Sequence, residues 1–162
     1  MSLSNSQIGF NFQATQSKDN GGFNPTTQEA SLSFGVAPDA SVLNRVLLTE
    51  GTLAAGANTT VDLYSFTDRA GNATLATKAR GLAITATGDT GILKIEPGAS
   101  DPATWFFSGT TPAISLNCGT DGCGFCLYDG SSYTLSATIR NLKLSNTGLA
   151  SIDWSLYALL GT

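Results

Sequence analysis

The chain has 162 residues, of which 12% are charged, whereas an ordinary soluble domain carries about 25%. Small and hydroxyl residues replace the charges, with 18 Gly, 17 Ser and 21 Thr, while the 41% of hydrophobic residues is typical of a folded chain. A net charge of -4 and scattered basic residues exclude a phosphate-binding stripe, so no nucleic acid partner is expected. Histidine is absent, which excludes Ser-His-Asp and Cys-His catalysis. We therefore expect no enzyme activity and no cofactor.

The first residues, MSLSNSQIGF, carry neither a basic n-region nor an apolar h-region. No stretch approaches the roughly 18 apolar residues that a membrane span needs. We therefore expect no membrane partner.

Residues 1–40 are rich in Asn, Gln, Ser and Gly and carry isolated phenylalanines at positions 10, 12, 23 and 34. One interpretation is an extended arm, whose aromatic residues would need a partner surface such as a neighbouring subunit. The alternative is an edge strand from Ile8 to Phe12, followed by a loop of the same domain. The arm interpretation makes Ile8, Phe10, Phe12, Phe23 and Phe34 candidate contact residues.

Residues 41–162 show strand periodicity and no apolar repeat at helical spacing. Turn residues bound the predicted strands every ten positions or so. This pattern is typical of an all-β, antiparallel β-sandwich or jelly-roll domain. The predicted strands are 42–49, 58–64, 79–87 and 91–96, with shorter candidates at 105–107, 113–116 and 124–128.

The C-terminal third has the clearest alternation. Apolar residues first occupy odd positions from Tyr133 to Ile139 and then even positions at Leu142 and Leu144, so a bulge or bend is expected near 140–141. The turn residues 146–148 predict a terminal hairpin leading into the last strand. That strand places on one face Ile152, Trp154, Leu156, Ala158 and Leu160.

Three consecutive aromatic residues, Trp105, Phe106 and Phe107, cannot all face one side of a strand. They could form a contact between subunits, which we favour because interfaces are enriched in aromatic residues. They could instead stack on a sugar, or pack into the sandwich itself.

The cysteines are clustered at positions 118, 123 and 126, in NCGTDGCGFC. Three thiolates could hold zinc, with Asp121 or a cysteine of another subunit as the fourth ligand, but a closed zinc site normally shows four ligands at recognised spacings, so we expect no metal. A turn whose thiols pack as small apolar groups is favoured. A Cys118–Cys123 or Cys118–Cys126 disulfide ranks between the zinc site and the apolar turn.

Carboxylates could serve as a glycosidase acid and base, and five are available at Asp62, Asp68, Asp89, Glu96 and Asp101. Their spacing singles out no pair. Most of them lie beside Gly, Thr or Pro, where Asp normally stabilises a turn. The Asp-Gly turns at 121–122 and 129–130 lack the spacing of a calcium loop.

Three segments, DLYSFTDRAGN (62–72), ARGLAITATGDTGILKIEPGA (79–99) and TLSATIRNLKLSNTGLASIDWSLYALLG (134–161), resemble a class of small bacteriophage virion structural proteins. In that class a D-L-x-x-x-T-D turn precedes a strand, and the chain ends in an LK-x-x-N-x-G turn, an apolar strand and Gly. The resemblance implies a sandwich or jelly roll displayed on a particle, as capsid decoration (cement) or as part of the tail. It carries over no functional residue and covers neither the arm nor the cysteines.

The sequence therefore predicts a virion structural protein, assembled in the host cytoplasm, that decorates and stabilises a capsid. The expected partners are the major capsid protein or another virion protein, and identical copies of this chain, with a trimer as the favoured oligomer. Two alternatives stay open: a tail, fibre or adaptor subunit, and a carbohydrate-binding module.

Overall fold

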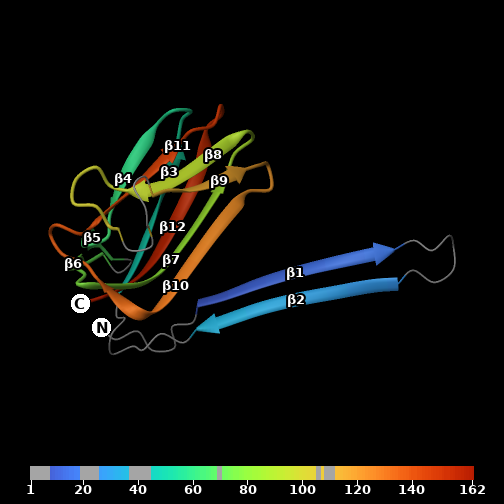
Figure 1. The fold of residues 1–162 in the computed structure, drawn as a ribbon, viewed down its shortest axis with the longest axis horizontal. Helices are drawn as coiled ribbons and strands as arrows, with labels where there is room; N and C mark the ends of the chain where they lie inside the picture. Colours follow the sequence, from blue (N-terminus) through green and yellow to red (C-terminus); the bar gives the residue numbers. More distant parts are fainter. Residues whose placement is uncertain (1–7, 19–25, 37–44, 69–70, 105–106, 108–111) are drawn as a thin grey trace. The chain divides into compact units, whose positions relative to one another are not determined.

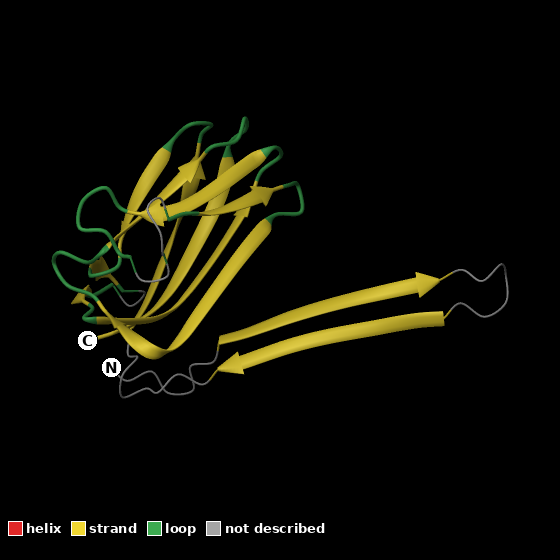
Figure 2. Ribbon diagram, in the orientation of Figure 1, coloured by secondary structure: helices red, strands yellow, loops and turns green. Residues whose placement is uncertain are grey.

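The computed structural model describes residues 8–18, 26–36, 45–68, 71–104, 107 and 112–162. Figure 2 shows strands and loops throughout this part of the chain, which contains no helix that could cross a membrane. The strands, labelled in Figure 1, are β1 (Ile8–Lys18), β2 (Thr26–Val36), β3 (Arg45–Leu53), β4 (Asn58–Asp62), β5 (Ser65–Thr67), β6 (Ala73–Leu75), β7 (Lys78–Thr87), β8 (Gly91–Pro97), β9 (Ile114–Cys118), β10 (Cys123–Thr134), β11 (Asn141–Asn146) and β12 (Ile152–Gly161).

The chain divides into two compact units, Ser2–Ala40 and Ser41–Thr162. The second unit is built from two four-stranded antiparallel sheets (Figure 1). The first sheet has the strand order β10-β7-β12-β3, and the second has the order β4-β11-β8-β9. β5 and β6 form a small separate hairpin between β4 and β7.

The pairing of the eight sandwich strands is nested. The outermost strands along the chain pair with each other (β3 with β12), and the next ones inward pair likewise: β4 with β11, β7 with β10, and β8 with β9. Folding this long antiparallel ribbon over itself places alternate pairs in opposite sheets, which is the arrangement of an eight-stranded jelly roll. The predicted all-β jelly roll is confirmed.

The core lies between the two sheets and follows the period of two along each strand. In β12 the even-numbered side chains from Ile152 to Leu160 are buried, as predicted, and Trp154 is 7% exposed. A single cluster joins these residues to the inner faces of β3, β7, β4, β8 and β11. Its largest fully buried members are Leu63, Leu82, Ile84, Leu93, Ile95, Leu142, Leu144, Ile152, Leu156 and Leu160.

The predicted terminal hairpin is wrong, because β11 lies in the second sheet and β12 in the first. The turn residues instead close a crossover between the sheets. The buried Asn146 amide donates to the carbonyls of Leu53 (3.0 Å) and Ala150 (2.7 Å), and its side-chain oxygen accepts the Gly148 N–H (2.9 Å). A Cβ at Gly148 would lie 2.4 Å from the Thr90 carbonyl oxygen. Glycine is therefore required where the crossover packs against the β7–β8 turn.

The expected bend near 140–141 is also a change of sheet. β10 ends at Thr134, and Ser136 and Ile139 exchange backbone hydrogen bonds of 3.1 and 3.2 Å in a tight turn before β11 begins in the opposite sheet. The switch of apolar residues from odd to even positions follows from this crossover, because each strand then presents its own face to the core.

In the first unit, β1 pairs with β2 in antiparallel register along their full length, from Ile8 opposite Val36 to Lys18 opposite Thr26. The N-terminal strand is thus longer than the predicted Ile8 to Phe12, and it pairs with β2.

Candidate interaction surfaces

The N-terminal hairpin separates apolar from polar positions. Successive residues of a strand alternate between the two faces of a sheet, and directly paired residues share a face. In the observed register the face that we call the apolar hairpin face is formed by Ile8, Phe10, Phe12 and Ala14 of β1, paired with Val36, Phe34, Leu32 and Ala30 of β2. The opposite face carries glycine and polar residues, including Asn11 paired with Ser33.

This arrangement brings together four of the five phenylalanine and isoleucine contact candidates of the arm, whereas Phe23 lies outside the described residues. β2 was not among the strands predicted from the sequence. Its signal is the alternation of Ala30, Leu32, Phe34 and Val36, which is as regular as that of the predicted strands.

Of the three consecutive aromatic residues, Trp105 and Phe106 lie outside the described residues. Phe107 is half-buried and packs against the sandwich core, and its N–H donates to the Thr104 carbonyl at 3.0 Å. At least one aromatic side chain of this segment therefore packs against the protein's own core.

The outer face of the first sheet carries an apolar patch that the sequence analysis did not identify. Two neighbouring rows of the register run across the sheet, Leu48–Tyr157–Ala83–Cys126 and Val46–Leu159–Gly81–Tyr128. We call their side chains the outer apolar patch: Val46, Leu48, Ala83, Cys126, Tyr128, Tyr157 and Leu159.

The outer apolar patch contains no charged residue, and Tyr157 near its centre is 46% exposed. Leu159 is buried although it does not belong to the core cluster. The signal for this patch is the unbroken apolar runs at 46–48 and 156–160, because a strand that is apolar on both faces is typical of a sheet covered on both sides.

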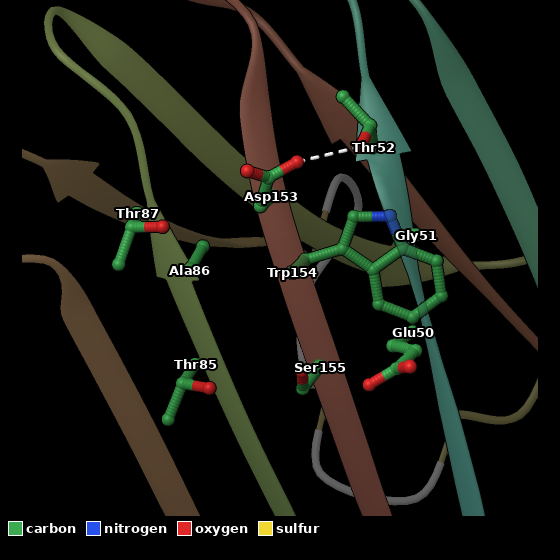
Figure 3. Close-up of a pocket in the computed structure, with 9 residues that line it drawn as sticks. All are labelled: Glu50, Gly51, Thr52, Thr85, Ala86, Thr87, Asp153, Trp154 and Ser155. Carbon is green, nitrogen blue, oxygen red and sulfur yellow. Dashed lines mark hydrogen bonds between the residues drawn. The ribbon is translucent and has the colours of Figure 1, made fainter.

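The adjoining part of the same outer face is polar. A shallow depression of about 380 Å³ is lined by Glu50, Thr52, Thr85, Thr87, Asp153 and Ser155, together with backbone and buried atoms of Gly51, Ala86 and Trp154 (Figure 3). The Thr52 hydroxyl donates to Asp153 Oδ1 at 2.5 Å. The Trp154 ring packs against Gly51. A Cβ built on Gly51 would lie 3.3 Å from the nearest ring carbon. A sugar thus finds no exposed aromatic face in this depression.

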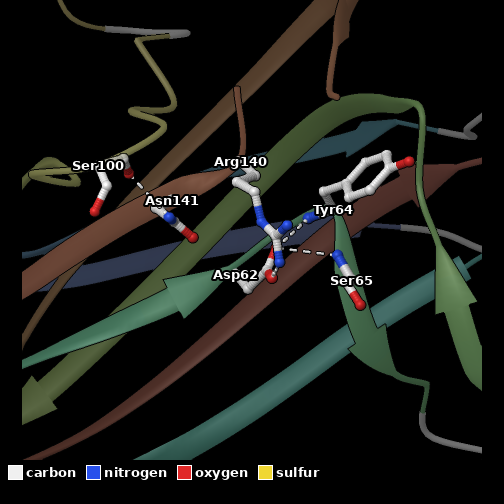
Figure 4. A network of polar contacts seen from close by, with 6 residues as sticks. All are labelled: Asp62, Tyr64, Ser65, Ser100, Arg140 and Asn141. Atoms are coloured by element: carbon white, nitrogen blue, oxygen red, sulfur yellow. Dashed lines mark hydrogen bonds and ion pairs between the residues drawn. The ribbon is translucent and has the colours of Figure 1, made fainter. Parts of the chain in front are cut away.

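Three of the five carboxylates considered for glycosidase chemistry, Asp62, Asp68 and Glu96, are engaged in structural contacts. Asp62 accepts the N–H groups of Tyr64 (2.9 Å) and Ser65 (3.0 Å) through Oδ1 and pairs through Oδ2 with Arg140, whose guanidinium lies over the Tyr64 ring at 5.6 Å (Figure 4). The hydrogen bond and charge of Asp62 raise the pKa of Arg140. This network fastens the end of β4 to the start of β11.

Two further carboxylates also have hydrogen-bond or ion-pair partners. Asp68 accepts the Asn72 N–H at 2.9 Å. Glu96 contacts Lys94 (2.6 Å) and Lys143 (2.9 Å), and the Lys94 hydrogen bond is the main cause that holds the pKa of Glu96 below its ordinary value. A carboxylate held ionised by two cations is unsuited to act as a general acid near neutral pH.

The three thiols do not converge on one point. Cys118 ends β9 and Cys123 begins β10, the next strand along the chain, with their sulfurs 2.6 Å apart, whereas Cys126 lies on the outer face of β10. Across the described residues, no three cysteine or acidic side chains are grouped so as to hold a metal ion. Two sulfurs in contact are too few and too close together for a zinc site.

Comparison with known proteins identifies no family. No family model matches the chain, and no curated protein matches it either. Two solved structures align with it at 10% identity: the unassembled VP1 pentamer of Washington University polyomavirus, in a mutant form (TM-score 0.15, 99% of this chain and 96% of that chain), and the unassembled VP1 pentamer of KI polyomavirus (TM-score 0.16, 100% and 98%). TM-scores this low do not establish a shared fold, and the jelly-roll assignment follows from the strand order alone.

Proposed function

We propose that this protein is a structural component of a bacteriophage virion, a decoration or cement protein that binds and stabilises the head shell. The observation that carries the proposal is the N-terminal hairpin, whose register collects eight apolar residues on one face. A two-stranded hairpin is at best marginally stable in water unless a further surface covers its apolar side. The surface that we propose to cover the apolar hairpin face is the major capsid protein.

The low charge and the fold agree with this role. Identical copies with few charges have little electrostatic repulsion to overcome when they pack densely on a particle. Jelly rolls occur among viral capsid domains, although the same fold also serves in lectins and cupins, so the fold by itself does not select the function.

We assign the outer apolar patch to contacts between copies of this chain, in the trimer expected from the sequence. Interface cores are poor in charge and rich in aromatic residues, as this patch is with its two tyrosines. Tyr157→Asp places a carboxylate at the centre of the patch and is expected to convert the trimer to monomers, as measured by sedimentation equilibrium.

The matched control for the oligomer is Thr85→Asp, which adds the same charge to an exposed position in the polar part of the same face. It is expected to leave the trimer intact. A protein that is monomeric before any substitution, or a Tyr157→Asp variant that remains trimeric, contradicts the assignment.

Removal of residues 1–40 is expected to abolish binding to the shell while leaving a folded sandwich. The sandwich contains a core of its own, since among the residues whose burial the structure describes the core cluster runs from Leu47 to Leu160. Binding is measured by co-sedimentation with purified shells that lack the protein, and folding by far-UV circular dichroism and thermal unfolding.

A folded fragment 41–162 that sediments with shells as well as the full chain would rule out the hairpin as the anchor. If images of phage particles showed the protein on the tail instead of the head, the tail, fibre or adaptor alternative would be favoured.

The carbohydrate alternative depends on Trp105, and a glycan array tests it. Binding that is lost in Trp105→Ala would replace the cement proposal, whereas an array without binding counts against a sugar ligand.

A further inference from the structure

Cys118 and Cys123 are placed where the chain passes from one sheet to the other. Cys118 is the last residue of β9 in the second sheet, and Cys123 is the first residue of β10 in the first sheet. The turn between them is tight, with the Gly122 N–H donating to the Gly119 carbonyl at 2.9 Å. Gly122 has a φ of 85°, a left-handed conformation that favours glycine.

The two sulfur atoms lie 2.6 Å apart. This separation is shorter than the contact distance of two non-bonded sulfurs, so the two free thiols lie within reach of each other for a disulfide bond. We propose that Cys118 and Cys123 form a disulfide that staples the two sheets of the jelly roll together at the β9–β10 turn. Cys126 is left as a free thiol.

The geometry also decides between the two disulfides that the sequence leaves open. Cys123 and Cys126 are three residues apart on one strand, so they lie on opposite faces of β10. Cys123 packs against the core beside the buried Cys118, whereas Cys126 belongs to the outer apolar patch. A Cys118–Cys126 bond would require β10 to turn over.

The oxidation is a two-step exchange with a low-molecular-weight disulfide, such as oxidised glutathione. The thiolate of Cys123, the more exposed of the pair, attacks one sulfur of the oxidant and releases one glutathione thiolate. The Cys118 thiolate then attacks Cys123 Sγ and releases the second. Two protein thiols are oxidised, one glutathione disulfide is reduced to two thiols, and the two protons go to the glutathione thiolates.

The surroundings make this exchange slow at neutral pH. Burial, reinforced by the contact with Cys118, raises the pKa of the Cys123 thiol to about 12. Because only the thiolate reacts, the rate is expected to rise about tenfold for each pH unit between pH 7 and pH 9. The reducing glutathione pool of a host cytoplasm would keep both thiols reduced, and the bond would form later, in an oxidising medium.

The test is to incubate the folded full chain with oxidised glutathione at pH 9, where the thiolate is more populated, and then to count thiols with Ellman's reagent in denaturant. The expected count falls from three to one, with a mass lower by two hydrogen atoms and a peptide map joining Cys118 to Cys123. Closing this short loop is expected to raise the melting temperature by about 5 to 10 °C, reversibly with dithiothreitol.

Two variants serve as controls. Cys126→Ser should form the same bond and show no remaining thiol, while Cys123→Ser should lose both the bond and the rise in melting temperature. Three thiols after oxidation, a lasting glutathione adduct, or a bond that includes Cys126 would each overturn the proposal.

Discussion

Replacing Asn146 with alanine is expected to lower the free energy of unfolding by about 3 kcal/mol. The Asn146 side chain is 1% exposed and makes three hydrogen bonds, to the carbonyls of Leu53 and Ala150 and from the Gly148 N–H. Alanine removes all three and leaves buried backbone groups without partners, each of which costs about 1 kcal/mol or more. Urea unfolding followed by tryptophan fluorescence measures the change.

The control for this prediction is Asn117→Ala, at an exposed position of β9. Surface substitutions of this kind usually change stability by no more than about 0.5 kcal/mol. If both variants unfolded at the same urea concentration, the crossover from β11 to β12 would not depend on Asn146, and the account of how this end of the sandwich closes would be wrong.

The second large effect is expected at the hairpin. Phe10→Asp is predicted to weaken binding to the head shell by at least roughly 100-fold, because it places a charge in the apolar hairpin face. In the register Phe10 lies directly opposite Phe34, at the middle of the apolar positions. Equilibrium binding of labelled protein to purified shells gives the two dissociation constants.

The adjacent substitution Asn11→Asp is the matched control. It introduces the same residue one position along the same strand, and the register places that position on the polar face, opposite Ser33. Its affinity is expected to remain within about threefold of the unaltered chain. Equal losses in both variants would show that charge alone, and not the apolar face, governs binding.

Much of the sandwich could be predicted from the alternation of apolar residues. The period of two in β12 identified Ile152 to Leu160 as core, and Trp154 is buried as expected. Alternation specifies which face of a strand is buried, but it does not say which strand lies beside it.

The connections could not be predicted for the same reason. Asn146 and Gly148 have the composition of a hairpin turn, yet they close a crossover, because the partners of Asn146 include Leu53, far away in the sequence. The switch of apolar residues from odd to even positions before β11 was visible in the sequence. The strand order was needed to show that a change of sheet causes it.

The candidate surfaces were predicted in part. The aromatic residues of the N-terminal segment were identified individually, whereas their assembly into one face depends on pairing with β2. The outer apolar patch combines residues from β3, β7, β10 and β12, four strands that are separated from one another in the sequence. Similarly, the proximity of two sulfurs at a turn depends on backbone geometry that cysteine spacing does not specify.

The most direct test of the proposed function is electron cryomicroscopy of whole phage particles, with head and tail, that lack the protein, imaged before and after addition of the full chain. The account predicts added density at symmetry-related positions on the outside of the shell, in groups of three, with a two-stranded arm contacting the capsid protein. Shells that gain no density, or density confined to the tail, would contradict it.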